Sequence, residues 1–435
     1  MGHLGRLKAE YRDLVQRLER GTIALPEPED AVAREGWREI LEILFTPEEA
    51  ALAARLPVRP TALATVAEHL GVPEEELARR LEPMCEKGLV LDLPNPRTGR
   101  TVVLLAPPVV GFFEYSMMRA RDAIPKKRMA QALHAYTRGD PAFAREAFGR
   151  DTVIGRALVH EDAISDDPLP DVLAWERATE VVGGARAWAL SLCFCRHAAS
   201  HRGEACDAPQ EVCLSLNGGA EFVTRRRFGR AIDRAEALDV LARSRDLGLV
   251  QIADNVQRRP TFVCNCCGCC CEQLQGISTF GLRAVNPSGF TPRCDATRCA
   301  GCSRCARACP VGAIQMAPRL AHGTRRNALE PRLEVERCIG CGVCAGACGK
   351  GALEMARTSH PTVPANSIEK AVRMALERNR LADLLVDQGA GLGSRFLHRA
   401  IDVIVRLPPA QAALASEQVR SRFVDAAFRR FRDLS

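Results

Sequence analysis

Apolar residues recur every three or four positions along the first part of the chain, which is the spacing of amphipathic helices. The first 25 residues carry one such face, and Pro26 is expected to end the helix. We therefore predict N-terminal helices over residues 1–38. The apolar face consists of Leu4, Leu7, Tyr11, Leu14 and Leu18.

Residues 39–135 combine the helical spacing with two short apolar runs around a turn-rich segment. The second and third predicted helices end at glycines, and the two runs have the length of strands in a hairpin. This order is typical of a winged helix-turn-helix, so we predict a winged-helix-like domain. The predicted helices are Pro47–Leu56, Thr61–Leu70 and Pro73–Lys87, and the predicted strands are Leu89–Leu93 and Thr101–Leu105.

The pattern beyond the hairpin is again mainly helical, including most of residues 109–190. We predict a helical domain with cysteine-rich loops over residues 136–290, in which Asp233 and Glu236 have capping-box spacing at the start of a helix. Residues 359–435 are predicted to form a C-terminal helical extension, with helices over 367–386 and 396–432. The expected fold class is α+β and mostly helical. The last helix carries Arg429, Arg430 and Arg432.

A repeat with a period of 39 residues interrupts this helical pattern. Each half contains the run C-x2-C-x2-C-x3-C, followed by a short helix and a strand. Neither half is long enough to build a core alone. The matching cysteines are Cys299, Cys302, Cys305 and Cys309 in the first half and Cys338, Cys341, Cys344 and Cys348 in the second.

These two runs resemble those of the bacterial-type two-[4Fe-4S] ferredoxin domain, and Pro310 follows the first run as it does in that family. The resemblance covers about residues 291–357 and implies a ferredoxin-like ββαβ repeat domain over residues 291–358 with two [4Fe-4S] clusters. Gly349 stands where a second proline is common, and two zinc sites are the alternative. By this resemblance, Cys299, Cys302, Cys305 and Cys348 hold one cluster, and Cys338, Cys341, Cys344 and Cys309 hold the other.

Cysteine is the unusual feature of the composition. Nineteen of the 20 cysteines lie between Cys193 and Cys348. The start of the chain lacks the pattern of a secretory signal, and no apolar stretch has the length of a membrane span. We therefore expect a cytoplasmic chain whose thiols are reduced, so that clustered cysteines are metal ligands rather than disulfides.

Ten cysteines outside the repeat are candidate ligands of one or two additional iron–sulfur clusters. Their pairing is open, a non-cubane cluster or zinc remains an alternative, and His197 and His201 are further candidate ligands. No role is predicted for Cys294, and Cys85 is expected to be a buried core residue. The ten cysteines are Cys193, Cys195, Cys206, Cys213, Cys264, Cys266, Cys267, Cys269, Cys270 and Cys271.

The whole chain is similar to a group of long proteins of anaerobes that are described as 4Fe-4S ferredoxin-type. The similarity rests on the segments Cys193–His197, Cys264–Cys271 and Cys299–Cys348, together with the winged-helix-like front. It implies iron–sulfur binding but no particular activity.

These observations favour an electron carrier or oxidoreductase subunit over an autonomous enzyme. We expect single electrons to pass through the clusters to or from a redox partner protein, such as a larger oxidoreductase, in a homo- or hetero-oligomer. The alternatives are an iron–sulfur enzyme with a substrate-binding cluster at Cys264–Cys271 and a redox-responsive transcription factor. The net charge of +7 is modest and the predicted recognition helix Pro73–Lys87 is acidic, which disfavours nucleic acid as a partner.

Overall fold

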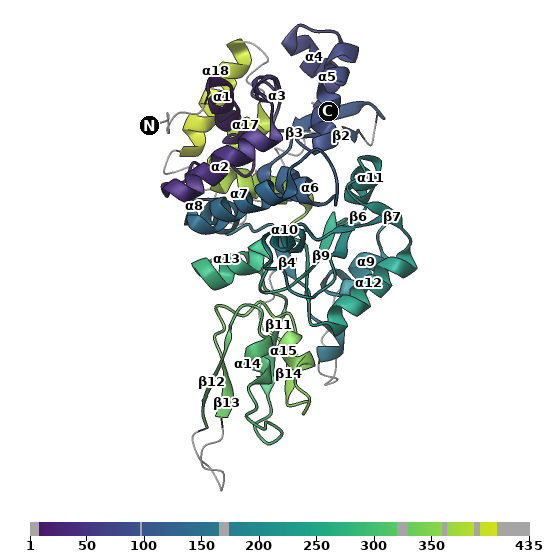
Figure 1. Ribbon diagram of the computed structural model, residues 1–435, viewed down its shortest axis with the longest axis vertical. Coiled ribbons are helices and arrows are strands. Elements are labelled where there is room, and N and C mark those ends of the chain that lie inside the picture. Colours follow the sequence, from purple (N-terminus) through teal and green to yellow (C-terminus); the bar gives the residue numbers. More distant parts are fainter. Residues whose placement is uncertain are drawn as a thin grey trace. The chain divides into compact units, whose positions relative to one another are not determined.

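The computed structural model describes residues 8–95, 98–164, 174–319, 329–358, 363–386 and 392–406, and all structural statements concern these residues. The chain divides into two compact units, each assembled from separate segments (Figure 1). The first unit comprises residues 1–116, 122–152 and 366–435, and the second comprises residues 117–121 and 153–365. Within the described residues, we find no helix that is both long and apolar enough to cross a membrane.

The first unit is mainly helical. Its first helix, α1, covers Ala9–Leu18 and therefore ends before the predicted end near Pro26. Leu4 and Leu7 of the predicted apolar face lie outside the described residues. The predicted helix over 367–386 is two helices, α16 and α17. The helices of this unit are α1 (Ala9–Leu18), α2 (Ala31–Leu44), α3 (Pro47–Ala53), α4 (Leu63–Leu70), α5 (Glu74–Lys87), α6 (Phe113–Met117), α7 (Lys126–Gly139), α8 (Pro141–Phe148), α16 (Ser367–Glu377), α17 (Leu381–Leu385) and α18 (Leu392–Arg406).

The predicted hairpin is confirmed. Strands β2 (Val90–Pro94) and β3 (Thr101–Leu105) pair antiparallel, and a short strand, β1 (Thr61–Ala62), adds to β3 to make a three-stranded sheet. Thr61 and Ala62 therefore belong to a strand and not to the predicted helix. Cys85 on α5 is buried, as expected.

The segment predicted as a helix over 396–432 is described as far as Arg406, and this part is helical. Helix α18 covers Leu392–Arg406. Arg429, Arg430 and Arg432 lie outside the described residues.

The second unit contains a seven-stranded mixed sheet, so the prediction of a helical middle domain is wrong. The strand order is β10-β4-β8-β9-β6-β5-β7, in which β10 and β4 are parallel and the other pairs are antiparallel. Several strands have five residues or fewer, and such short runs give a weak alternation signal. The strands are β4 (Gly155–Ala157), β5 (Trp188–Leu192), β6 (Glu211–Leu216), β7 (Arg230–Ile232), β8 (Val250–Asp254), β9 (Phe262–Cys266) and β10 (Val285–Asn286).

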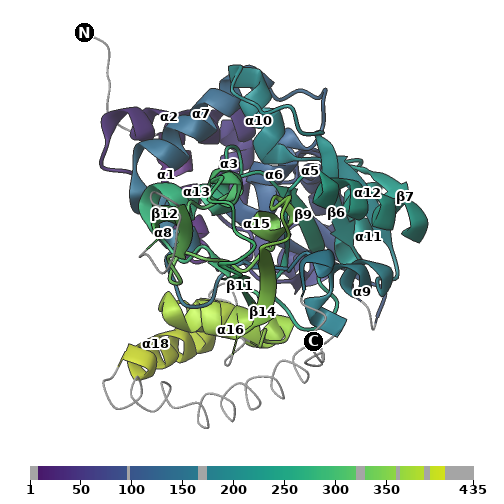
Figure 2. The same cartoon turned by 90° about the horizontal axis from the view of Figure 1, so that it is seen from below.

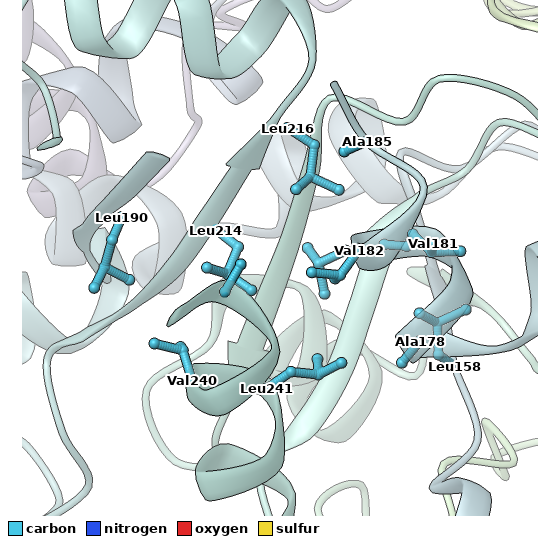
Figure 3. Packing of buried hydrophobic residues seen from close by; sticks show 13 residues of the cluster. Leu158, Ala178, Val181, Val182, Ala185, Leu190, Leu214, Leu216, Val240 and Leu241 are labelled. Atoms are coloured by element: carbon cyan, nitrogen blue, oxygen red, sulfur yellow. The ribbon is translucent and has the colours of Figure 1, made fainter. Parts of the chain in front are cut away.

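Helices α9 (Ala178–Gly183) and α12 (Arg234–Asp246) provide the apolar layer against this sheet. Leu214 on β6 packs in one buried cluster with Val182 on α9 and Leu241 on α12 (Figure 3). The predicted start of α12 is confirmed, because the Asp233 side chain accepts a hydrogen bond from the Glu236 backbone N–H at 2.8 Å. The other helices of the sheet region are α10 (Phe194–Arg202), α11 (Gly218–Arg225) and α13 (Glu272–Phe280).

The repeat forms two small antiparallel sheets around two short helices. In each half a cysteine loop is followed by a helix and a strand, as predicted, and α15 lies beside β14 (Figure 2). The pairs are β11 (Phe290–Cys294) with β14 (Leu353–Arg357) and β12 (Ile314–Pro318) with β13 (Leu329–Leu333), and the helices are α14 (Arg304–Ala308) and α15 (Val343–Gly346).

The packing between the sheet and α12 predicts a large cost for truncating Leu214, which is 0% exposed. Leu214→Ala should lower the free energy of unfolding by about 2–5 kcal/mol, because it removes buried methyl groups and leaves a cavity. Urea denaturation of the full chain measures this loss. Leu247→Ala is the matched control, since Leu247 is 56% exposed and a surface change of this kind costs about 0.5 kcal/mol or less. Equal losses in the two variants would contradict this assignment of the core.

Candidate metal centres

The two halves of the repeat hold their last cysteine in the same way. The Cys309 sulfur accepts a hydrogen bond from the Ala313 backbone N–H at 3.2 Å, and the Cys348 sulfur accepts one from the Ala352 N–H at 3.3 Å. Backbone N–H groups aimed at sulfur stabilise its anionic form and help to set the potential of a bound cluster. The sequence repeat is therefore also a repeat of the hydrogen bonds to sulfur.

One set of repeat cysteines surrounds a common cavity. Cys309 from the first half lines this space together with Cys338, Cys341 and Cys344 from the second half. Burial, followed by the charges of Cys309 and Cys338, raises the pKa of the Cys341 thiol to about 12. Binding of iron would displace the proton from this thiol. Four thiols converging on one cavity fit the donor set that a [4Fe-4S] cluster requires.

The other repeat cysteines also lie together. Cys299 and Cys348 are close enough to Cys305 for their charges to raise its pKa, after the larger effect of burial. Cys302 is exposed at the surface of the same loop. Cys294 lies beside Cys299 of this set. Partial desolvation, followed by the charge of Cys299, raises the pKa of the Cys294 thiol to about 12. No role could be predicted for Cys294 from the sequence, since this residue stands outside the repeated spacing.

Close approach of the backbone explains a glycine that recurs in both halves. Gly301 and Gly340 each have φ of +67°, a conformation that favours glycine. A Cβ atom on Gly301 would lie 2.8 Å from the Leu329 carbonyl oxygen, and one on Gly340 would overlap the Phe290 carbonyl oxygen. Each cysteine loop therefore lies directly against a strand of the small sheets.

Six of the ten additional cysteines form a second group, on and around the seven-stranded sheet. Residues alternate between the two faces of a strand, so Cys213 on β6 and Cys264 on β9 point away from the face that carries Leu214 and Val263. The sulfurs of Cys213 and Cys264 are 4.0 Å apart. We call this set the six-thiol group, and it consists of Cys193, Cys195, Cys213, Cys264, Cys266 and Cys271.

Contacts between neighbouring thiols connect the six-thiol group. Cys195 contacts Cys193 and Cys271, and Cys266 contacts Cys271 and Cys264. Hydrogen bonds from Cys213 and Cys266 lower the pKa of the Cys264 thiol to about 5. These contacts favour the thiolate form of Cys264, which is the form that binds metal.

Helix N-termini add to the electrostatic stabilisation of these thiols. Cys193 immediately precedes α10, and Cys271 immediately precedes α13. The pKa of the Cys271 thiol is well below its usual range, because Cys195 and Cys266 hydrogen-bond to it and the Gln273 and Leu274 N–H groups also face it. The predicted cysteine-rich loops are thus partly wrong, since several of these cysteines lie on strands or at the start of helices.

The remaining four additional cysteines form a separate, tighter group. One comes from the connection between α10 and β6, and three come from the turn between β9 and α13. Their sulfurs all lie within 4.8 Å of one another. We call this set the four-thiol group, and it consists of Cys206, Cys267, Cys269 and Cys270.

Arg196 on α10 lies next to both groups. Its side chain is 0% exposed and donates hydrogen bonds to the carbonyl oxygens of Pro209 and Asn265. Burial lowers the pKa of Arg196, but the neighbouring Cys193 and Cys267 outweigh burial and the net shift is upward. A buried guanidinium needs a nearby negative charge, and the thiolates provide it.

The two histidines of this region contact each other. The Nε2 atoms of His197 and His201 are 3.2 Å apart, and His197 Nδ1 lies 2.6 Å from the Met117 carbonyl oxygen. Both ring nitrogens of His197 are therefore engaged. Because both nitrogens make these contacts, the structure does not arrange His197 as a ligand of the thiols.

The turn between β9 and α13, which carries three cysteines of the four-thiol group, lies directly against the ferredoxin-like repeat. Gly268 stands between Cys267 and Cys269, and a Cβ atom on it would lie 2.5 Å from the carbonyl oxygen of Pro310. Pro310 directly follows Cys309, which lines the repeat cavity. This backbone contact brings the turn that carries Cys267 and Cys269 against the residue that follows Cys309.

The contact predicts that Gly268→Ala is destabilising. The new methyl group would overlap the Pro310 backbone and should lower the free energy of unfolding by about 1–3 kcal/mol. Urea denaturation measures the change. In the control Gly218→Ala, the added Cβ meets nothing within 4 Å, so equal losses in the two variants would show that the contact is absent.

Arg196 should be required for the stability of the thiol groups. Arg196→Gln removes the buried positive charge between them and should lower the free energy of unfolding of the metal-loaded chain by about 3–5 kcal/mol, which is the cost of leaving a buried charge without its partner. Denaturation under anaerobic conditions measures this. Arg243→Gln is the control, because Arg243 is 65% exposed in its ion pair with Asp239 and should cost about 0.5 kcal/mol or less.

Comparison with known proteins bears on the repeat. Residues 298–352 match the family model described as the 4Fe-4S dicluster domain. No curated protein and no solved structure matches the chain. The matched segment contains all eight repeat cysteines, so the chain contains a region similar to domains that carry two [4Fe-4S] clusters.

Proposed function

We propose that the chain is an iron–sulfur electron-transfer protein that passes single electrons through two ferredoxin-type [4Fe-4S] clusters and one further cluster. The observation that carries this proposal is the contact of Gly268 with Pro310. In this contact, the turn between β9 and α13 lies against Pro310, the residue that follows Cys309. The same turn connects Cys266 and Cys271 of the six-thiol group. The segment that carries Cys266 and the segment that carries Cys309 are therefore in contact near these two cysteines, within one compact unit.

The repeat cysteines would hold the first two clusters. The set around the cavity is Cys309 with Cys338, Cys341 and Cys344, and the second set is Cys348 with Cys299, Cys302 and Cys305. Such clusters supply one-electron chemistry at potentials between about −700 and +450 mV. The Ala313 and Ala352 N–H groups act on this chemistry by donating to Cys309 and Cys348.

The six-thiol group would hold the further cluster. Its members come from β6, β9 and the starts of α10 and α13, and Cys266 and Cys271 are buried. Four thiolates bind one [4Fe-4S] cluster, so the group has enough ligands. The N-termini of α10 and α13 would offset part of the negative charge.

Exposure of one repeat cysteine supports exchange with a redox partner protein. Cys302 is exposed, whereas Cys305 and Cys344 are buried in the small core of the repeat. Electrons would therefore enter or leave at the loop that carries Cys302. A larger oxidoreductase is the class of partner that we propose.

The number and redox activity of the clusters test this function. Anaerobically purified full-length protein should contain about twelve irons and about twelve sulfides per chain, because each cubane holds four of each. A redox titration followed by electron paramagnetic resonance should show reversible one-electron steps. Fewer than about eight irons, or clusters that are not reduced reversibly, would contradict the proposed function.

Single-residue variants separate the further cluster from the repeat. Cys266→Ser should remove about four irons and leave the resonance signals of the repeat clusters unchanged. Cys302→Ser should perturb a repeat signal and leave the further cluster in place. Cys85→Ala is the control, since Cys85 lies on α5 in the other unit and its removal should not change the iron content. Unchanged iron in Cys266→Ser would refute the further cluster alone.

A further inference from the structure

The four-thiol group is more compact than an iron–sulfur cluster requires. Its sulfurs all lie within 4.8 Å of one another, and those of Cys269 and Cys270 are 3.6 Å apart. Zn–S bonds of about 2.3 Å in a tetrahedron place the sulfurs about 3.8 Å apart. A cubane holds its thiolates farther apart, because four irons and four sulfides stand between them.

The repeat cysteines provide an internal comparison. Among the residues that the structure describes, which include all eight repeat cysteines, no second set of three or more metal-binding side chains meets the same 4.8 Å separation. The thiols with the spacing of cluster ligands are thus spread more widely than the four-thiol group. This difference in the distances between sulfur atoms indicates that the four-thiol group binds a smaller metal centre than the repeat cysteines do.

The surroundings of the four-thiol group fit a closed anionic site. A zinc ion with four thiolates carries a net double negative charge, and the guanidinium of fully buried Arg196 lies beside both Cys206 and Cys267. Complete ligation by four cysteines leaves no open coordination position, as in structural zinc sites. Arg196 is therefore a positioning residue that supplies the countercharge.

We propose that Cys206, Cys267, Cys269 and Cys270 bind a single structural zinc ion. The ion joins the connection between α10 and β6 to the turn between β9 and α13. Gly268 lies inside this turn, so zinc also fixes the segment that contacts Pro310. The site holds the six-thiol group and the repeat in a constant relative position without itself taking part in electron transfer.

Metal analysis of the full-length protein tests the site. Anaerobically purified protein should contain about one zinc per chain, and X-ray absorption at the zinc edge should show four sulfur ligands at about 2.3 Å. Absence of zinc, zinc bound by nitrogen or oxygen, or a single iron with four sulfur ligands in its place would overturn the proposal. This measurement uses the unaltered protein, so it decides the question even if variants fail to fold.

Variants assign the zinc to the four cysteines. Cys206→Ser and Cys269→Ser should each lower the zinc content at least tenfold after mild chelation, while iron and sulfide stay constant. Cys294→Ser, at an exposed thiol outside the group, is the matched control and should retain zinc. Loss of iron and sulfide in place of zinc would overturn the proposal and assign these thiols to a cluster. Either outcome leaves the repeat clusters intact, so it is distinguishable from failure of the proposed electron transfer.

Discussion

Negative charge is the constraint on which the second unit depends, because ionised thiols repel one another when they are brought together away from water. The structure meets this constraint with three kinds of positive group. Arg196 is fully buried beside Cys193 and Cys267, helices α10 and α13 begin at Cys193 and Cys271, and backbone N–H groups donate to the repeat cysteines. None of these groups is a metal ligand, yet each lowers the cost of assembling the ligands.

The seven-stranded sheet holds Cys213 and Cys264 in fixed positions. Alternation along β6 sends Leu214 to the apolar layer beside α12 and Cys213 to the opposite face. The same alternation along β9 separates Val263 from Cys264. One sheet therefore carries a hydrophobic core on one face and thiols on the other, so the stability of the core and the geometry of the thiols depend on the same backbone register.

The repeat cysteines could be predicted from the sequence because their ligand spacing is local and occurs twice. The division of the other ten cysteines could not, since Cys213 and Cys264 meet only through strand pairing, and Cys206 meets Cys267 only through the fold. A usable signal was present, because Cys264 and Cys266 alternate with Val263 and Asn265 in a strand-like pattern. The helices of the first unit were predicted more accurately, since caps such as Gly71 and Gly88 act locally.

The pairing of β11 with β14 joins the beginning of the repeat region to its end. Cys348 lies just before β14, and its charge reaches Cys305 in the first half. When only the first half has been synthesised, β11 lacks its partner strand and Cys305 lacks its neighbour Cys348. Under the proposed ligand assignment, the first site would therefore be complete only after the second half has been made.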